Sequence, residues 1–244
     1  MIFKIKNTFR IWLCLIVTGP AFILAMQSCG KSGAASPTGL NIQYQILNLS
    51  PNLGYLSLYI DFNQVNGLTS PYIYGVSSGY FYVPSTDTPY QFRPFIYNGN
   101  SGTTLFSRSD VLKTGLKYTI FLTGSAVSGV PQQIFTTDNI ESEPAIGRGK
   151  IRFVNASPTG TTGLDFYANG TLAFGAVPYL TATAFKEIPV GTYDMQIMTT
   201  GTTGVLNDQP SITIQDGRLY TIYAYGYTTR ADSASFNAGI ITNK

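Results

Sequence analysis

The fold is predicted from the segment that begins with Lys150-Ile-Arg-Phe-Val-Asn-Ala-Ser-Pro158 and ends with Asp216-Gly-Arg-Leu-Tyr-Thr-Ile-Tyr223. At its start, Ile151 and Phe153 alternate with Arg152, and this period of two is typical of a half-buried β-strand. The proline that follows ends the strand because it has no N–H to donate to a sheet. The stretch therefore opens with a strand whose arginine we expect to face solvent.

Further strands follow at short intervals. The run Gly163-Leu-Asp-Phe-Tyr-Ala168 alternates again and ends at Asn169-Gly170, a pair that tolerates the positive φ angles of a type I′ hairpin turn. About six or seven such strands fit into residues 150–226, with a turn signal roughly every ten residues. This density predicts an all-β sandwich or barrel and leaves no room for an ordinary helix.

An earlier part of the chain, residues 42–124, is a diverged copy of this stretch. Five blocks recur in the same order, and the offset between them drifts only from 107 to 102 residues. The pairs are Asn48-Leu-Ser-Pro51 with Asn155-Ala-Ser-Pro158, Tyr55-Leu-Ser-Leu-Tyr-Ile60 with Leu164-Asp-Phe-Tyr167, Gly79-Tyr-Phe-Tyr-Val-Pro84 with Ala184-Phe-Lys-Glu-Ile-Pro189, Tyr90-Gln-Phe-Arg-Pro-Phe95 with Tyr193-Asp-Met-Gln-Ile-Met198, and Gly115-Leu-Lys-Tyr-Thr-Ile120 with Gly217-Arg-Leu-Tyr-Thr-Ile222. Chance does not explain five blocks that recur in the same order, so we predict a tandem duplication. We expect one β-sandwich domain at 41–140 and a second at 149–244.

The first 28 residues have the character of a secretory signal peptide. A basic head precedes a sixteen-residue apolar run at 11–26, which is short for a membrane-spanning helix. The Ser28-Cys29-Gly30 sequence that follows resembles the lipobox of bacterial lipoproteins, in which the cysteine is diacylated and becomes the first residue. The alternatives are an ordinary signal peptide cleaved near Ser28 and a retained membrane anchor.

The cysteine count favours lipidation of Cys29. Of two cysteines, Cys14 lies in the apolar run, so the mature chain has no partner for an intramolecular disulfide. Acyl chains would hold Cys29 to a membrane by about 0.8 kcal/mol per buried methylene. The small residues of 29–40 predict a flexible tether. We expect a lipid-anchored protein of the cell envelope, at the outer membrane, with Lys31 leaving open which face it occupies.

Composition argues against several kinds of function. The formal net charge of +3 belongs to the three basic residues of the leader, and the rest of the chain carries no basic cluster of the kind that binds nucleic acid. The chain has no histidine, which removes the usual general base and the commonest zinc ligand. No glycine-rich phosphate loop is present. We expect no catalytic residues, no metal and no cofactor, and hence a protein that is not an enzyme.

Carboxylates offer the remaining route to catalysis, through a glycosidase-like pair. The candidates on or beside strands are Asp61, Asp165, Glu187 and Asp194. Asp165 alternates with apolar neighbours, so we expect it to point to solvent. The acidic segment 138–143 could offer oxygen atoms to calcium, but it lacks the glycine and alternating aspartates of a calcium loop, and a solvated linker is the simpler interpretation.

Seventeen tyrosines allow two interpretations. Tyr118 and Tyr220 share the sequence Gly-x-x-Tyr-Thr-Ile, and each resembles the structural tyrosine corner of immunoglobulin-like sandwiches, in which the hydroxyl ties down a turn. The pairs Tyr72 with Tyr74 and Tyr80 with Tyr82 each project from one strand face. If exposed, these four rings would form a stacking platform for a glycan or a protein partner. Otherwise they belong to a half-buried face or to the contact between the domains.

The motifs of the second copy, Asn155-Ala-Ser-Pro158, Asp165-Phe-Tyr-Ala-Asn-Gly170, Ile188-Pro-Val-Gly-Thr-Tyr193 and Asp216-Gly-Arg-Leu-Tyr-Thr-Ile222, resemble those of the bacterial domain of unknown function 4397. The resemblance implies exported, immunoglobulin-like β domains, often in tandem on lipoproteins, with no assigned activity. We therefore expect a non-enzymatic envelope lipoprotein serving adhesion, scaffolding or presentation at the membrane surface. The alternatives are a carbohydrate-binding module of a glycan-uptake system and, third, a carboxylate-dependent hydrolase.

Overall fold

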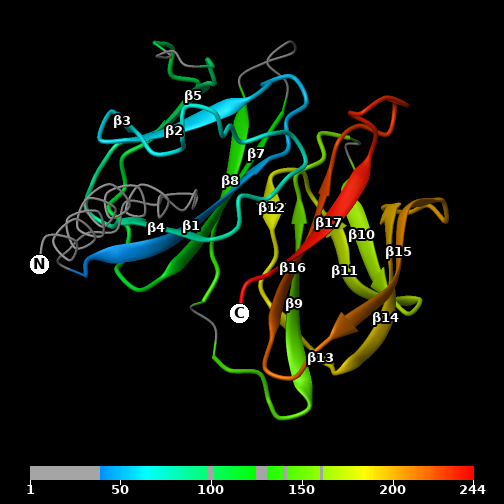
Figure 1. Ribbon diagram of the computed structural model, residues 1–244. Coiled ribbons are helices and arrows are strands. Elements are labelled where there is room, and N and C mark those ends of the chain that lie inside the picture. The colour runs from blue at the N-terminus through cyan, green and yellow to red at the C-terminus, as the bar shows by residue number, and fades with distance from the viewer. Residues whose placement is uncertain (1–38, 98–101, 125–130, 140–141, 160–161) are drawn as a thin grey trace, which may run out of the picture. The chain divides into compact units, whose positions relative to one another are not determined.

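A computed structural model describes residues 39–97, 102–124, 131–139, 142–159 and 162–244 (Figure 1). These residues form strands, turns and loops without any helix, which confirms the predicted all-β class. The described segments accordingly include no helix able to cross a membrane. The predicted signal peptide, Cys29 and most of the predicted tether lie outside the described residues.

The first repeat, residues 39–139, contains two sheets of four strands. One has the order β4-β1-β7-β8 and the other the order β3-β2-β5-β6. The strands are β1 (Asn41–Asn48), β2 (Leu56–Ile60), β3 (Asn63–Gln64), β4 (Phe81–Pro84), β5 (Tyr90–Pro94), β6 (Phe106–Arg108), β7 (Lys117–Thr123) and β8 (Gln132–Thr137). Strands β1 and β7 run parallel, and every other neighbouring pair is antiparallel.

The second repeat, residues 142–244, has the same arrangement. One sheet has the order β12-β9-β16-β17, with β13 also paired to β9, and the other has the order β11-β10-β14-β15. The strands are β9 (Arg148–Asn155), β10 (Leu164–Ala168), β11 (Thr171–Val177), β12 (Thr181–Ala182), β13 (Lys186–Pro189), β14 (Gly191–Thr199), β15 (Val205–Ile214), β16 (Leu219–Tyr225) and β17 (Asn237–Thr242). The parallel pair is now β9 with β16, so the duplication seen in five sequence blocks extends to the order and direction of the strands.

Each repeat has a core of its own between its two sheets. In the first, Tyr44 of β1 and Phe92 of β5 belong to one buried cluster with residues of β2, β4, β6 and β7. In the second, Phe153 of β9 and Phe166 of β10 stack with ring centres 5.3 Å apart, in a cluster that includes residues of β11, β14, β15, β16 and β17. Alternate residues of the strands supply these cores, which is why the period of two was visible in the sequence.

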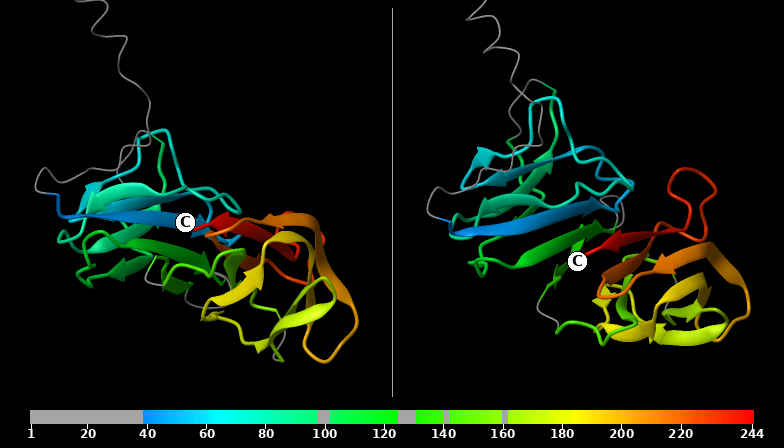
Figure 2. Two further views of the ribbon diagram at one scale, coloured as in Figure 1. Left: turned by 90° about the horizontal axis from the view of Figure 1, so that it is seen from below. Right: turned by 60° about the horizontal axis from the view of Figure 1, so that its bottom comes forward.

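A third apolar cluster joins the two repeats, which belong to one compact unit. It combines Leu47, Phe121 and Ile134 from the first repeat with residues of the second, namely Val154, Ala156, Tyr223 and Ile241. These side chains lie on the opposite faces of β1, β7, β9 and β16 from the repeats' own cores. The central strands are therefore buried on both faces. Figure 2 shows the sheets of the two repeats in further views.

Candidate functional site

The Asn-x-Ser-Pro motif forms the same hydrogen bonds in both repeats. The Ser157 N–H donates to Asn155 Oδ1 at 3.1 Å, and its hydroxyl donates to the carbonyl of Gly226 at 2.6 Å. In the first repeat, Ser50 donates in the same way to Asn48 at 3.3 Å and to the carbonyl of Gly124 at 2.5 Å. All four side chains are fully buried. The motif thus fastens the end of the first strand to the glycine that follows β7 or β16.

Tyr118 and Tyr220 also occupy equivalent positions. The Tyr118 hydroxyl accepts a hydrogen bond from the backbone N–H of Lys113 at 3.0 Å, and the Tyr220 hydroxyl accepts one from that of Gln215 at 3.2 Å. Each donor lies five residues upstream, before the turn that leads into the strand. Both hydroxyls therefore hold a turn against the strand that follows it.

A buried polar network lies beside the apolar cluster between the repeats. Asp138, which follows β8, is fully buried and forms an ion pair with Arg152 of β9, whose exposure is 3%. The carboxylate also accepts from Thr119 at 2.5 Å and Thr136 at 2.8 Å, and the arginine Nε donates to Thr221 at 2.7 Å. Two expectations were wrong: Asp138 is not part of a solvated linker, and Arg152 does not face solvent. Both charges are buried because they lie where the two repeats meet, with Asp138 on the first repeat and Arg152 on the second.

Tyr80 belongs to this network. Its hydroxyl donates to Asp138 at 2.8 Å and accepts from the Asn243 amide at 2.9 Å, and the ammonium of Lys117 lies 5.0 Å from its ring centre. Burial, with the negative charge of Asp138 adding to it, raises the pKa of Tyr80. The ring is engaged on its polar edge and faces a lysine, so it is not a free stacking surface.

The other three tyrosines of the predicted platform lie in different surroundings. Tyr72 packs against the first core and stacks on Phe81, with ring centres 6.4 Å apart. Tyr74 makes an edge contact with Tyr225 of the second repeat at 5.7 Å. Tyr82 alone is exposed, at 53%. The structure therefore does not gather the four rings on one exposed face.

The strand carboxylates Asp165 and Asp194 accept hydrogen bonds from the backbone of neighbouring strands. Asp165 is only 8% exposed, so the expectation that it points to solvent was wrong. Its Oδ1 accepts hydrogen bonds from the Ala176 N–H and from the Thr200 hydroxyl, both at 2.7 Å. A register shift between β10 and β11 leaves the Ala176 N–H without a partner in the strand ladder, and the carboxylate takes that place. Asp194 similarly accepts from the N–H of Ser211 at 3.0 Å. In the described chain, no cluster of three or more carboxylates could hold a metal ion.

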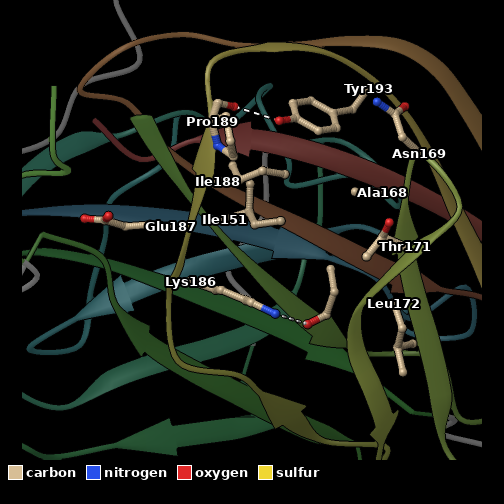
Figure 3. Close-up of a pocket in the computed structure, with 11 residues that line it drawn as sticks. Ile151, Ala168, Asn169, Thr171, Leu172, Lys186, Glu187, Ile188, Pro189 and Tyr193 are labelled. Carbon is tan, nitrogen blue, oxygen red and sulfur yellow. Dashed lines mark hydrogen bonds between the residues drawn. The ribbon is translucent and has the colours of Figure 1, made fainter. Parts of the chain in front are cut away.

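A pocket of about 260 Å³ opens at the edge of the second repeat, between β11 of one sheet and β13 of the other (Figure 3). Apolar side chains dominate its wall: Ile151, Ala168, Leu172, Ala173, Ile188 and Pro189. At one end of β13, the Tyr193 hydroxyl donates to the Pro189 carbonyl at 2.8 Å. At the other end, the Lys186 ammonium reaches across to the Ala173 carbonyl of β11 at 3.3 Å.

Sequence reasoning missed this pocket, although the alignment of the two copies contained its signal. In the first repeat, β1 pairs with β4 so that Tyr44 lies opposite Phe81. In the second, β9 pairs with β13 in the same register, and Ile151 lies opposite Lys186. Two aromatic rings are thus replaced by an aliphatic side chain and a lysine. Only the pairing of β9 with β13 shows that both substituted residues line the same pocket.

The fold defines an all-β protein made of two copies of one two-sheet unit. The family described as domain of unknown function (DUF4397) matches residues 43–162 and again 149–243. The chain belongs to this family and carries two tandem copies of its domain. A comparison with curated proteins found no match.

Proposed function

We propose that this chain is a non-enzymatic lipoprotein of the bacterial cell envelope that presents two immunoglobulin-like β-sandwich domains as one rigid body. Acylation of Cys29 would anchor it, at the outer membrane, and residues 29–40 would act as the tether. Its role would be adhesion, scaffolding or presentation of a binding surface. The observation that carries this proposal is the buried contact between the repeats, since a fixed pair of domains suits a protein that holds a surface in position.

The contact has the properties of a permanent interface. It combines an apolar cluster with a buried ion pair whose hydrogen bonds are supplied from both repeats. The Thr123 hydroxyl also donates to the Ala156 carbonyl at 2.5 Å across the same boundary. Separating the repeats would expose apolar side chains and leave the charges of Arg152 and Asp138 without their partners. The chemistry of the boundary therefore supports the proposal of rigid presentation.

Anchoring and rigidity are tested separately. Cells that express the full chain would be labelled with a palmitate analogue, and the label should appear on the wild-type chain and disappear in Cys29→Ser. Small-angle scattering of the same Cys29→Ser chain should give a single compact pair of domains. Absence of label on the wild type would contradict anchoring, and a scattering profile of two independently moving domains would contradict rigid presentation.

A carbohydrate-binding module is the second candidate, and the exposed ring of Tyr82 is the observation that favours it. An aromatic ring with an open face can stack on a sugar. A glycan array should then show saturable binding that Tyr82→Ala abolishes. Tyr80→Ala removes a hydroxyl from the Asp138 network, so its effect would have to be separated from destabilisation by a parallel unfolding measurement.

A further inference from the structure

The two repeats fill the space beside the equivalent strands β4 and β13 differently. In the first, the ring of Tyr44 is fully buried, stacks on Tyr90 with centres 5.5 Å apart and meets Phe81 edge-on at 6.2 Å. In the second, Tyr193 keeps the place of Tyr90, and its hydroxyl makes the equivalent bond to a proline carbonyl. The aromatic filling beside it is gone, and the pocket of about 260 Å³ takes its place.

The pocket has the size of a small ligand. A cavity of about 150 Å³ lined by aliphatic and aromatic side chains holds benzene, so this pocket has room for about ten non-hydrogen atoms. Ile151 is buried at the base, and Ala168 beside it is only 6% exposed. In Figure 3, Ile151 and Ile188 lie between Tyr193 and Lys186. The body of a fitting ligand must therefore be apolar.

Two charged residues line this pocket, Lys186 and Glu187, and the lysine is the one that reaches across it, to the Ala173 carbonyl. The Lys186 ammonium has three N–H donors, and the weak bond to the Ala173 carbonyl uses one of them. The neighbouring Glu187 points away in Figure 3, and its Oε1 accepts from the Ala145 N–H at 3.2 Å. Among the described residues, no carboxylate pairs with Lys186. The lysine is thus placed to bind an anionic group at the pocket mouth.

We propose that this pocket binds a small carboxylate carried on an apolar chain or ring of about ten non-hydrogen atoms in total. The apolar body lies against Ile151, Ala168 and Ile188, and the carboxylate accepts from the Lys186 ammonium. Such a site goes beyond presentation of a surface, because it gives the second repeat a ligand that the first repeat has no room for at the equivalent position. It does not depend on the lipid anchor.

Isothermal titration calorimetry of the whole chain tests the site with three probes. Octanoate carries its carboxylate on an alkyl chain, and 3-phenylpropanoate carries its carboxylate on a chain that ends in a phenyl ring. Octan-1-ol has the same chain length as octanoate but no charge. Saturable binding of either carboxylate at one site, at least about tenfold tighter than octan-1-ol, is expected from a charge-assisted hydrogen bond. Comparison of the two carboxylates decides between a chain and a ring. No saturable binding of either at millimolar concentrations would overturn the proposal.

Variants assign the binding to this pocket. Lys186→Met keeps the aliphatic stem and removes the charge, so it should weaken carboxylate binding about tenfold while leaving octan-1-ol unchanged. Lys186 is exposed, and this change should not affect folding. Lys113→Met, an exposed lysine of the first repeat, is the matched control and should bind like the wild type. The double change Ile151→Tyr with Lys186→Phe restores the filling of the first repeat and should abolish binding. Equal affinities of Lys186→Met and wild type would overturn the assignment.

Discussion

Asp138 and Arg152 form an ion pair across the boundary between the two repeats, and both side chains are buried. An ion pair away from water is costly unless its remaining hydrogen-bonding groups are satisfied. Here Thr119 and Thr136 donate to the carboxylate, and Thr221 and Thr136 accept from the guanidinium. The pair therefore ties the first repeat to the second through a satisfied network rather than through a single contact.

Asp138→Ala should lower the free energy of unfolding by about 3–5 kcal/mol, because it leaves the guanidinium of Arg152 buried without a counter-charge. Urea unfolding followed by circular dichroism measures the change. The matched control is Asp232→Ala, which breaks the exposed ion pair with Arg230 and removes the acceptor of the Ala234 N–H, and which should cost much less than Asp138→Ala because the pair is screened by water. Similar losses in the two variants would mean that the boundary pair is no more important than a surface pair.

The serine of the Asn-x-Ser-Pro motif should stabilise both repeats, but not equally. Ser50→Ala leaves the carbonyl of Gly124 without its hydroxyl donor and should cost about 1–3 kcal/mol. Ser157→Ala should cost less, because the Thr159 hydroxyl also donates to the Gly226 carbonyl at 3.3 Å. Thermal unfolding of the two variants gives the comparison. A larger loss for Ser157→Ala would contradict this account of the motif.

Gly226 lies in a position that no other residue should tolerate. Its φ angle is +78°, and a Cβ atom there would lie 2.2 Å from the carbonyl oxygen of Ser235. Gly226→Ala should therefore cost about 3 kcal/mol or more, since it combines a left-handed backbone with a clash against backbone.

Gly170 is the matched control for this change. Its φ angle is +71°, but no atom lies within 4 Å of an added Cβ. Gly170→Ala should cost only the conformational penalty of about 1–2 kcal/mol. Unfolding in urea distinguishes the two, and equal losses would show that the backbone of Ser235 moves aside without cost.

The sequence predicted the features that depend on alternation and on repetition. Ile151 and Phe153 alternate as strand residues do, and the five recurring blocks correspond to equivalent strands in the two repeats. Contact between the repeats could not be predicted in the same way. Arg152 and Asp138 carry charges that normally indicate solvent, and they are buried because each meets the other repeat.

The pocket and the burial of Asp165 escaped prediction for a related reason. Each depends on the register of a strand pair, which the sequence of one strand does not contain. Lys186 meets Ile151 because β13 pairs with β9 in that register, and Asp165 is covered because β11 shifts register against β10. The alignment of the two copies shows that Ile151 and Lys186 replace two aromatic residues. That both replacements lie beside the same space can be seen only from the pairing of the strands.

Alkaline pH should destabilise the fold through the tyrosines at the boundary. Burial, with Tyr225 adding a smaller effect, raises the pKa of Tyr223 to about 12, whereas a tyrosine in the unfolded chain has a pKa of about 10. Between these values the unfolded chain loses the proton and the folded chain keeps it. The stabilisation is therefore complete below about pH 10 and is lost as the pH rises to about 12, at up to about 1.4 kcal/mol per pH unit for this group.

Tyr223→Phe should flatten the fall in unfolding free energy over that range, as measured by urea titrations at several pH values. Tyr97→Phe, whose ring is 69% exposed, is the control and should follow the wild type. An unchanged slope in Tyr223→Phe would mean that this hydroxyl does not carry its proton through the alkaline range in the folded protein.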